Sequence, residues 1–449
     1  MVSYYKIFRK SKTNGRAFKK RHAKLVKSHM NHKQNSTNGL SLLIKDIKGF
    51  SQAQNAWRFY NNENVDIKSL NDPILQTGLE TIEKECSEYL LVAHDWSLVN
   101  YRNHTTKDDC IETKRSNSTN AISKGYDLQS SLAISDKRGE PITPLIHNMK
   151  TKDKIYSTYN NSIDINQTHL NELSHRITYI NNELNINKKI VHIIDREADS
   201  VGFFRELQEN DLYIVRALDR VSVEYKGNTV TQKKLAETLE LGEYVKTIEY
   251  KKKQVKIYVN SVDIDITRDT YVKYINDKGK VAYKKEKGRA IKSRFIVERL
   301  IDSDNDVVAT WLLLSNLKED VDSKTIGLWY YYRWNIETYF KLLKSSGFNL
   351  EKWQQESSEA IFKRLLIASY ACLLVWQIEH SSQKNILEIK TFLVKLSGRL
   401  VARGKVSTSP ALLAGIWSFF STMDILELYD IEKLISMKNE LNDFLGMDF

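Results

Sequence analysis

Two short apolar runs that each end in an aspartate restrict the fold of this chain more than any other feature. The first, LLVAHD, ends in Asp95, and the second, KIVHIID, ends in Asp195. Runs of this length and composition predict buried strands, here with the aspartate at the strand end. The other elements expected around them are helices at 165–185 and 199–208 and strands at 126–135, 141–147 and 212–218. Strands interspersed with helices indicate an α/β domain.

A third acidic residue lies on a predicted helix. The stretch WYYYRWNIETYFKLLK has no Pro or Gly between positions 328 and 346, so nothing in it breaks a helix. At about 100° per residue, one face roughly 60° wide carries the side chains of Tyr330, Arg333, Glu337 and Lys344. The apolar residues Ile336, Tyr339, Phe340 and Leu343 form a neighbouring face suited to packing against a core.

The narrow polar face combines one carboxylate with two cations and a phenol. A carboxylate can ligate a hard metal ion, and cations can hold phosphates beside it, which suits phosphodiester chemistry. The alternative is that Arg333 and Glu337 form an ordinary surface pair at i, i+4. Four fixed residue types at these offsets should arise by chance in roughly fewer than one chain in a hundred, which favours the functional interpretation.

The spacing Tyr-x2-Arg-x3-Glu-x6-Lys resembles the motif of the DDE transposases of insertion-sequence family four, which includes the Tn-five transposase. The segments LLVAHDWSLVNYRNH and KKIVHIIDREADSVGFFREL fit the places of that family's first and second catalytic aspartates. AWRFYNNENV near the N-terminus and GRLVARGKVSTSPALLAGIW near the C-terminus are also similar. The resemblance covers nearly the whole chain in order.

The resemblance implies that Asp95, Asp195 and Glu337 are catalytic and together ligate two Mg²⁺ ions, for which Mn²⁺ substitutes. Two such ions about 4 Å apart can activate the attacking oxygen and stabilise the leaving one. For each aspartate alone, the alternative is a turn residue at a strand end. Glu197 and Asp199 are further acids close to Asp195 whose roles the sequence leaves open.

The resemblance also implies a set of DNA contacts. Tyr330, Arg333 and Lys344 would contact the phosphates and sugar beside the scissile bond. Arg216 matches a DNA-contacting arginine, with a solvated charge as the alternative. Trp311 matches a tryptophan that stacks on a base flipped from the duplex and so helps to form a DNA hairpin, with an ordinary core tryptophan as the alternative. Arg58 aligns with a residue that binds the transposon end.

Strand-end aspartates followed by a helix glutamate indicate a ribonuclease-H-like α/β catalytic core, expected over residues 71–372. Glu337 lies 142 residues after Asp195, which is too long for one connection. We therefore expect an inserted antiparallel β domain at about 220–310, where apolar and polar residues alternate. A helical region is expected at 373–449. The resemblance implies that it serves as a dimer face, and the alternative is that it only caps the catalytic core. The helical domain at 1–70 is separated from the core by a joint at 71–73.

The positive charge of the chain is concentrated in the N-terminal domain. Residues 1–60 contain 14 Lys or Arg and one acid, whereas the whole chain carries a net charge of +12. Apolar residues in the same segment can bury a small core and leave the cations outside, which predicts a helical DNA-binding domain. Lys19, Lys20, Arg21, Lys24 and Lys27 are candidate phosphate contacts. A solvated basic tail is the alternative.

The cysteines and the lengths of the apolar runs indicate where in the cell the protein is expected. Three cysteines with no metal-ligand spacing indicate reduced thiols in a cytosolic protein. No uninterrupted apolar run approaches 18 residues, so no membrane-spanning helix and no membrane partner are expected. The resemblance implies a cytoplasmic, nucleoid-associated bacterial protein.

The predicted function is that of a DNA transposase that binds terminal inverted repeats, cuts both strands and joins the 3′ ends to target DNA, as a homodimer on double-stranded DNA. One alternative is a catalytically inactive or inhibitory protein that binds DNA ends, and another is a ribonuclease-H-like nuclease. A tyrosine recombinase would also place a Tyr near an Arg, but it would use Tyr330 as a nucleophile without a metal.

Overall fold

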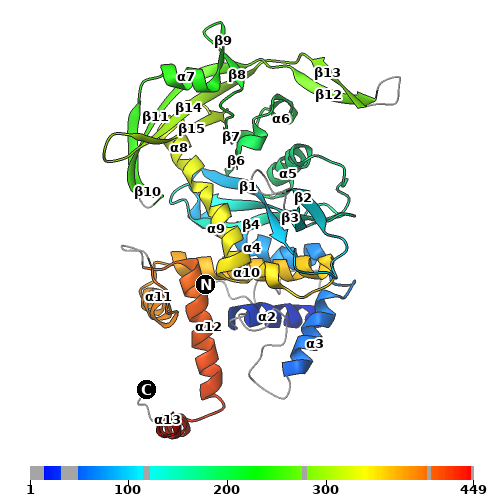
Figure 1. Ribbon diagram of the computed structural model, residues 1–449, viewed down its shortest axis with the longest axis vertical. Helices are drawn as coiled ribbons and strands as arrows, with labels where there is room; N and C mark the ends of the chain where they lie inside the picture. The colour runs from blue at the N-terminus through cyan, green and yellow to red at the C-terminus, as the bar shows by residue number, and fades with distance from the viewer. Residues whose placement is uncertain are drawn as a thin grey trace.

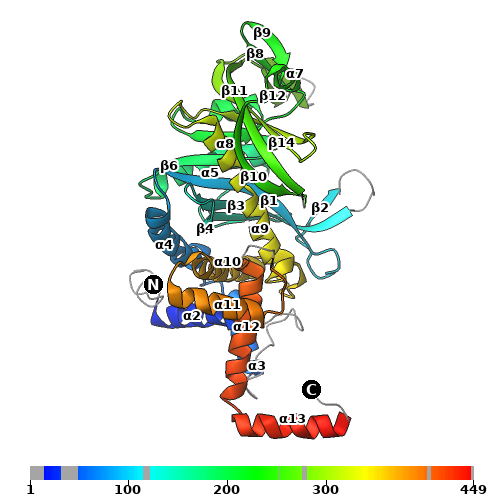
Figure 2. The same ribbon diagram turned by 90° about the vertical axis from the view of Figure 1, so that its left-hand side faces the viewer.

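The computed structural model of the protein describes residues 15–31, 49–114, 122–251, 253–275, 281–401 and 406–445. Over these residues the chain is a mixed α/β protein built on one large mixed sheet. Figure 1 and Figure 2 show the sheet in the upper part of the molecule and a layer of helices from both ends of the chain below it.

The centre of the sheet has the strand order β4-β3-β1-β6-β7. Strands β1, β6 and β7 are parallel, whereas β3 and β4 follow β1 as an antiparallel meander. Their bounds are β1 (Tyr89–Asn100), β3 (Ile122–Ser135), β4 (Pro141–Lys150), β6 (Lys189–Ile194) and β7 (Leu212–Arg216), with β2 (Ile111–Lys114) and β5 (Ile155–Ser157) at the edge. The strands predicted from the apolar runs are therefore confirmed, with β2 and β5 as additions.

The antiparallel region expected at about 220–310 is present, but it continues the same sheet. Strand β15 pairs with β7, and the order then runs β14-β11-β8-β9, with β10 beside β11. The bounds are β8 (Ser222–Tyr225), β9 (Asn228–Thr231), β10 (Glu243–Tyr250), β11 (Lys253–Ile266), β14 (Ile291–Ile301) and β15 (Val307–Ser315). Strands β12 (Thr270–Ile275) and β13 (Val281–Glu286) form a separate two-stranded hairpin.

Helices pack on the sheet and form the lower layer (Figure 1). Their bounds are α2 (Arg16–Asn31), α3 (Gly49–Tyr60), α4 (Ile67–Glu85), α5 (His169–Glu183), α6 (Val201–Glu206), α7 (Gln232–Thr238), α8 (Ser323–Tyr332), α9 (Trp334–Lys341), α10 (Ser358–His380), α11 (Lys384–Leu396), α12 (Ser409–Leu426) and α13 (Ile431–Leu445). Short helical turns are η1 (Arg196–Ala198), η2 (Leu342–Ser346) and η3 (Leu350–Lys352).

Alternation along β1 sorts its side chains between two hydrophobic clusters. Leu91 and Ala93 pack in the cluster that contains α9 and α10, whereas Leu90 and Val92 pack in the cluster that contains α5. Because successive side chains in a strand point to opposite faces, Asp95 lies on the α9 side and His94 on the α5 side.

The N-terminal and C-terminal helices share one core with the helices that pack under the sheet. Leu25 and Val26 of α2 and Phe59 of α3 pack in the same cluster as α10 and α12, and the Trp417 indole donates to the backbone oxygen of His29 (2.9 Å). The expected boundaries at 70/71 and 372/373 fall inside α4 and α10. The joint expected at 71–73 is helical too, and α4 includes Pro73. Residues 1–14 and 32–48 of the expected basic domain lie outside the described part.

Helices α10 and α12 are long and apolar enough to span a membrane by length and composition alone. In α10, 83% of the apolar window is buried within the protein, compared with 44% in α12. Because most of its apolar window is buried, α10 fits a core helix under the sheet.

Candidate functional site

The two aspartates occupy equivalent positions on neighbouring parallel strands. Pairing between β1 and β6 ends at Ala93 and Ile193, and each aspartate follows two residues later. Asp195 comes directly after β6, as predicted. Asp95 does not lie at a strand end as predicted, because β1 continues to Asn100 by pairing with β3, with Asp95 opposite Ser130. The antiparallel meander extends the strand beyond the point where its parallel partner stops.

The motif helix is not one regular helix. Helix α8 ends at Tyr332, Arg333 keeps right-handed helical backbone angles, and α9 begins at Trp334. The last turn, η2, is a π-helix that contains Lys344. The irregularity at Arg333 and the wider last turn shift the side chains away from the uniform 100° spacing that the sequence prediction assumed.

The guanidinium of Arg333 lies among three carboxylates. Its Nη1 is 3.0 Å from Asp95 Oδ2, and its Nη2 is 2.8 Å from Glu337 Oε1 and 3.9 Å from Asp195 Oδ2. The side chain of Arg333 is only 8% exposed, whereas that of Asp195 is 39% exposed. The structure therefore brings together the three acids that the sequence singled out, and one motif residue is the centre around which they meet.

Burial and nearby acids make the carboxyl groups of Asp95 and Glu337 harder to ionise. Desolvation raises the pKa of Asp95, and the nearby Arg333 opposes that rise. Desolvation also raises the pKa of Glu337, with Arg333 opposing and the two aspartates adding to the rise. Acids with raised pKa values gathered around one cation are typical of a functional site.

Three predicted DNA contacts lie beside this carboxylate cluster. The hydroxyl of Tyr330 donates to Asp195 Oδ1 at 3.4 Å, and burial raises the pKa of Tyr330 to about 12. Arg216 ends β7 with its Nη1 3.9 Å from Asp195 Oδ1. Trp311 on β15 is half-buried, with its ring 6.1 Å from the ring of Tyr330 in an edge-to-face arrangement. Trp311 is thus neither fully buried in the core nor fully exposed.

Lys344 lies apart from the carboxylate cluster. Its ammonium donates to the backbone oxygen of Leu98 (2.6 Å) and pairs with Glu351 (3.0 Å). It lines a cleft of about 590 Å³ to which Arg102 and Lys352 also contribute. In the described conformation, this lysine holds the end of the motif helix against β1.

Arg58 lies on α3, among the helices of the lower layer, and the structure does not bring it to the carboxylate cluster. Its side chain is exposed. Of the candidate phosphate contacts on α2, Lys20, Arg21 and Lys24 are exposed and Lys19 is partly exposed.

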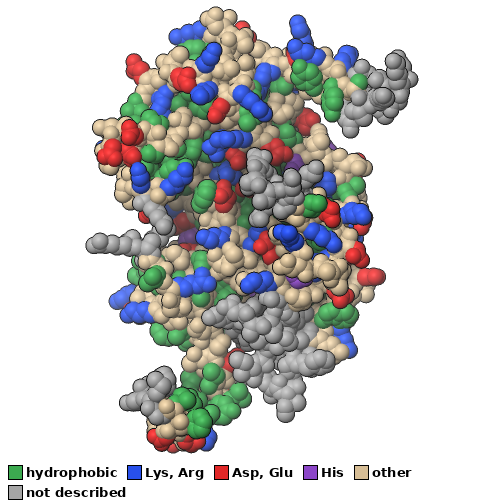
Figure 3. Space-filling model, viewed as in Figure 1, with side chains coloured by type: hydrophobic (Ala, Val, Ile, Leu, Met, Phe, Trp, Pro, Cys, Tyr) green, Lys and Arg blue, Asp and Glu red, His purple; other side chains and the backbone are tan. Residues whose placement is uncertain are grey.

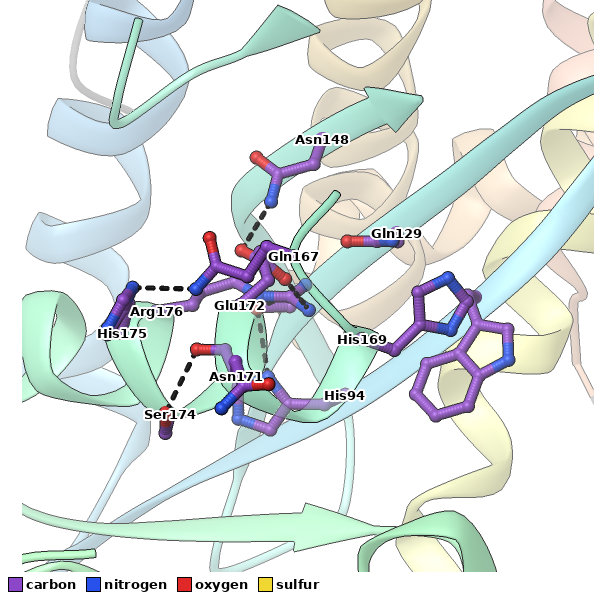
Figure 4. A network of polar contacts seen from close by, with 12 residues as sticks. His94, Gln129, Asn148, Gln167, His169, Asn171, Glu172, Ser174, His175 and Arg176 are labelled. Atoms are coloured by element: carbon purple, nitrogen blue, oxygen red, sulfur yellow. Dashed lines mark hydrogen bonds and ion pairs between the residues drawn. The ribbon is translucent and has the colours of Figure 1, made fainter. Parts of the chain in front are cut away.

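A buried polar network lies behind the aspartates, between the sheet and α5 (Figure 4). His94 Nε2 is 2.9 Å from His192 Nδ1. Arg176 of α5 donates to Glu172 (2.8 Å), and both side chains are almost completely buried. Glu172 also accepts from Asn148 (2.5 Å). His94 and His192 precede the two aspartates on their strands, so this network fixes both strands from the opposite face of the sheet. Sequence reasoning missed it because each of these residues is unremarkable in its local pattern.

A second network holds α9, the helix that carries Glu337. The hydroxyl of Tyr339 donates to Ser369 Oγ of α10 (2.7 Å) and lies 3.0 Å from His147 Nε2. His147 Nδ1 is in turn 2.8 Å from Ser130 Oγ on β3. The prediction placed Tyr339 on the core face, but the polar partners of its hydroxyl were not foreseen.

His169 joins two further acids beside the site. Its Nε2 is 2.8 Å from Asp127 Oδ2, its Nδ1 is 3.6 Å from Glu197 Oε1, and its ring lies against that of Trp96. Hydrogen bonding to Asp127 and Glu197 raises the pKa of His169 to about 9. Glu197 therefore pairs with a cation, whereas the fully buried Asp199 accepts from Arg268 (2.8 Å) in the loop before β12.

The atoms of the carboxylate cluster that could ligate a metal ion are all oxygens, and oxygens are the ligands that Mg²⁺ and Mn²⁺ prefer. Among the described residues, no three His, Cys, Asp or Glu side chains stand close enough together to hold an ion. Arg333 occupies the space between the acids. The three carboxylates are thus suitable ligands for a hard divalent ion, but the guanidinium of Arg333 must first leave the space between them.

A family model described as the transposase DDE domain matches residues 124–376, which is more than half of the chain. The match includes Asp195 and the whole motif helix, and it begins after Asp95. No curated protein matches the chain.

Proposed function

The chain belongs to the family of proteins with a transposase DDE domain, and from that premise we propose that it is a DNA transposase of insertion-sequence family four, similar to the Tn-five transposase. It would bind terminal inverted repeats, cut both DNA strands and join the 3′ ends to target DNA. The observation that supports this most is the meeting of Asp95, Asp195 and Glu337 around Arg333.

The proposed catalytic core is ribonuclease-H-like. Support comes from the central strand order, in which β1 lies between the antiparallel β3 and the parallel β6. This order puts two acids at the same level on adjacent strands, and the motif helix adds the third. We propose the region before residue 71 as the DNA-end-binding part, with Arg58 among its contacts.

Transposases of this kind generally use divalent metal ions. We propose that Asp95, Asp195 and Glu337 hold two Mg²⁺ ions, which supply an activated water and stabilise the leaving oxygen. The chain's own cations would then hold the DNA. Arg333, once it leaves the carboxylates, has a planar donor set suited to a phosphate, and Arg216 lies next to Asp195 on the same side.

We propose two further contacts with DNA. The cleft beside the end of the motif helix offers Arg102 and Lys352 to the backbone of a bound strand, together with Lys344 once it leaves Glu351. Trp311 is half-buried with one edge against Tyr330, so its ring could receive an unstacked base and favour a DNA hairpin intermediate.

Cleavage of a labelled duplex that carries the flanking inverted repeats tests the proposal. We expect double-strand release with Mg²⁺ or Mn²⁺ and none with EDTA, because the carboxylates would bring the ions to the scissile phosphate. A DNA hairpin product would support the role of Trp311. Tight binding of the ends without cleavage in either metal would favour an inactive or inhibitory end-binding protein. Cleavage without preference for the repeats would favour a ribonuclease-H-like nuclease.

We further propose that the protein acts as a homodimer on DNA, in the cytoplasm and at the nucleoid of a bacterium. Helix α13 extends from the body (Figure 2) and contains no buried residue. It exposes Ile435 (54%) and Phe444 (86%), which is apolar surface suited to a second copy. Replacing both by Asp should shift the mass of the protein–DNA complex from a dimer to a monomer in light scattering. Asn439→Asp on the same helix should leave it unchanged, and an unchanged mass for the double variant would exclude α13 as the dimer contact.

A further inference from the structure

The motif helix is interrupted at the residue whose side chain enters the carboxylate cluster. The backbone N–H of Arg333 donates to the Tyr330 carbonyl (3.0 Å), and the N–H of Ile336 donates to the Arg333 carbonyl (3.0 Å). Both hydrogen bonds span three residues, as in a 3₁₀ turn, whereas those of an α-helix span four. A tightened stretch inside a helix often marks a hinge. The backbone that carries the guanidinium is therefore a candidate hinge.

The β3–β4 turn holds this break in place. The side-chain amide of Asn335 donates to the backbone oxygen of Tyr332 (2.8 Å) and to that of Gly139 in the turn (2.8 Å). Gly139 has a φ of +67°, and a Cβ at this position would overlap the ring of Tyr332, so the close packing requires glycine. Asn335 therefore gives a carbonyl at the break a partner and ties the break to the core sheet.

The guanidinium of Arg333 holds oxygens that a metal ion would need. It lies 2.8 Å from Glu337 Oε1 and 3.0 Å from Asp95 Oδ2, inside the cluster. In the part of the chain that the structure describes, no three acidic side chains already converge closely enough to ligate an ion. To hold an ion in the space between them, the carboxylates must exchange the guanidinium for the ion. The two cations therefore compete for the same groups.

The carboxylate cluster is open to solvent on one side. The side chains of Asp195 and Glu337 are 39% and 34% exposed. Figure 3 shows acidic and basic side chains together on the face that α8 and α9 cross in Figure 1. Both an ion and a DNA phosphate can approach the cluster from this side. A phosphate offers the guanidinium another anionic partner, because the planar donors of arginine suit phosphate as well as carboxylate.

We propose that Arg333 is an internal counter-ion of the metal site and that Asn335 is the residue that positions it. In the DNA-free protein the guanidinium competes with metal ions for Asp95 and Glu337, so the protein binds these ions weakly. A DNA phosphate that takes the guanidinium frees the carboxylates, so DNA and metal ions bind cooperatively. This inference rests on the proposed function and adds a control to it, in which metal binding depends on DNA.

Binding of Mn²⁺ to the DNA-free, full-length protein tests the competition. Electron paramagnetic resonance measures the free Mn²⁺ during a titration. Arg333→Met removes the charge but keeps much of the length of the side chain. This variant should bind Mn²⁺ about tenfold more tightly than the wild type, because its carboxylates have no cation to release. Arg138→Met is the matched control, since Arg138 also joins two carboxylates, Glu85 and Glu140, but on the surface. It should bind Mn²⁺ like the wild type.

Two further variants connect the effect to the cluster and to the helix break. Adding Glu337→Gln to Arg333→Met should abolish the gain in Mn²⁺ affinity, and a gain that persists would overturn the proposal by placing the ion elsewhere. Asn335→Ala keeps all three acids and Arg333 but releases the break from the β3–β4 turn. It should bind Mn²⁺ about threefold more tightly than the wild type, whereas a merely structural role for Asn335 predicts weaker binding. Wild-type affinity in both Arg333→Met and Asn335→Ala would also overturn the proposal.

Cooperativity with DNA gives an independent readout. Mn²⁺ should tighten the binding of a duplex that ends at the cleavage site, by a factor about tenfold larger in the wild type than in Arg333→Met. Equal factors would contradict the coupling. If the wild type cleaves DNA but Arg333→Met gains no Mn²⁺ affinity, the counter-ion proposal is wrong and the transposase proposal stands. If Arg333→Met gains an affinity that needs Glu337 but the wild type cleaves no DNA, Arg333 is the counter-ion and the proposed function fails.

Discussion

Replacing Glu337 by Gln should lower DNA cleavage by about three orders of magnitude or more while leaving the binding of DNA ends within a few-fold of the wild type. The amide keeps the shape of the side chain and can still accept from Arg333, but it removes one of the three charges that would hold the metal ions. Cleavage rates at saturating DNA with Mg²⁺, together with end-binding affinity in EDTA, measure the two effects separately.

Glu85→Gln is the matched control for Glu337→Gln. Glu85 also pairs with an arginine, Arg138, but on the exposed surface. The Glu85→Gln variant should cleave DNA at the rate of the wild type. Cleavage by Glu337→Gln at the wild-type rate would remove Glu337 from the metal-binding set. If Glu337→Gln also lost end binding and melted at a lower temperature, the change would instead report on folding.

Acidification from pH 6.5 to 5 should destabilise the protein steeply. Burial lowers the pKa of His147 and of His192 to about 3, with the Arg176 cation adding to the effect in both cases. In the unfolded chain both imidazoles titrate near 6.5, so below that pH the unfolded state binds protons that the folded state does not. The stability that these groups contribute is complete above about pH 6.5 and is lost as the pH falls toward 3. Each of the two histidines should lower the free energy of unfolding by about 1.4 kcal/mol for each pH unit of acidification.

Urea unfolding at several pH values between 6.5 and 5 measures this loss. His192→Asn should reduce the slope of the free energy of unfolding against pH by about 1.4 kcal/mol per pH unit. His175→Asn, at an exposed position, should not change that slope. His169 does not interfere in this range, because its pKa is raised to about 9 and its contribution is lost only as the pH rises from about 6.5 through 9. A stability independent of pH, or an unchanged slope in His192→Asn, would contradict the prediction.

The central strands and the three acids could be predicted because their patterns are local. The KIVHII run matches β6 residue for residue. The stretch from Tyr330 to Lys344 is helical throughout, although not as one regular helix. The sequence also indicated that Asp95, Asp195 and Glu337 share one site, through a resemblance in their order and spacing.

The position of Arg333 could not be predicted from the helix alone. A helical wheel puts it next to Glu337, but only the packing of α9 against β1 puts its guanidinium within 3.0 Å of Asp95, 238 residues earlier in the chain. The same holds for Lys344, whose partners on β1 and at Glu351 depend on the π-helical last turn.

The sequence by itself determined which segments become strands and helices and which chemical groups they carry, because side-chain periodicity and residue type act over neighbouring residues. Only the tertiary structure decided that β15 joins the β insertion to the core sheet, that His94 and His192 meet behind the aspartates, and that one arginine gathers three acids. Such contacts join residues about 100 or more positions apart, and they follow from strand order and helix packing. These contacts stabilise the protein only once the fold has assembled. No single segment therefore shows them in the periodicity of its sequence.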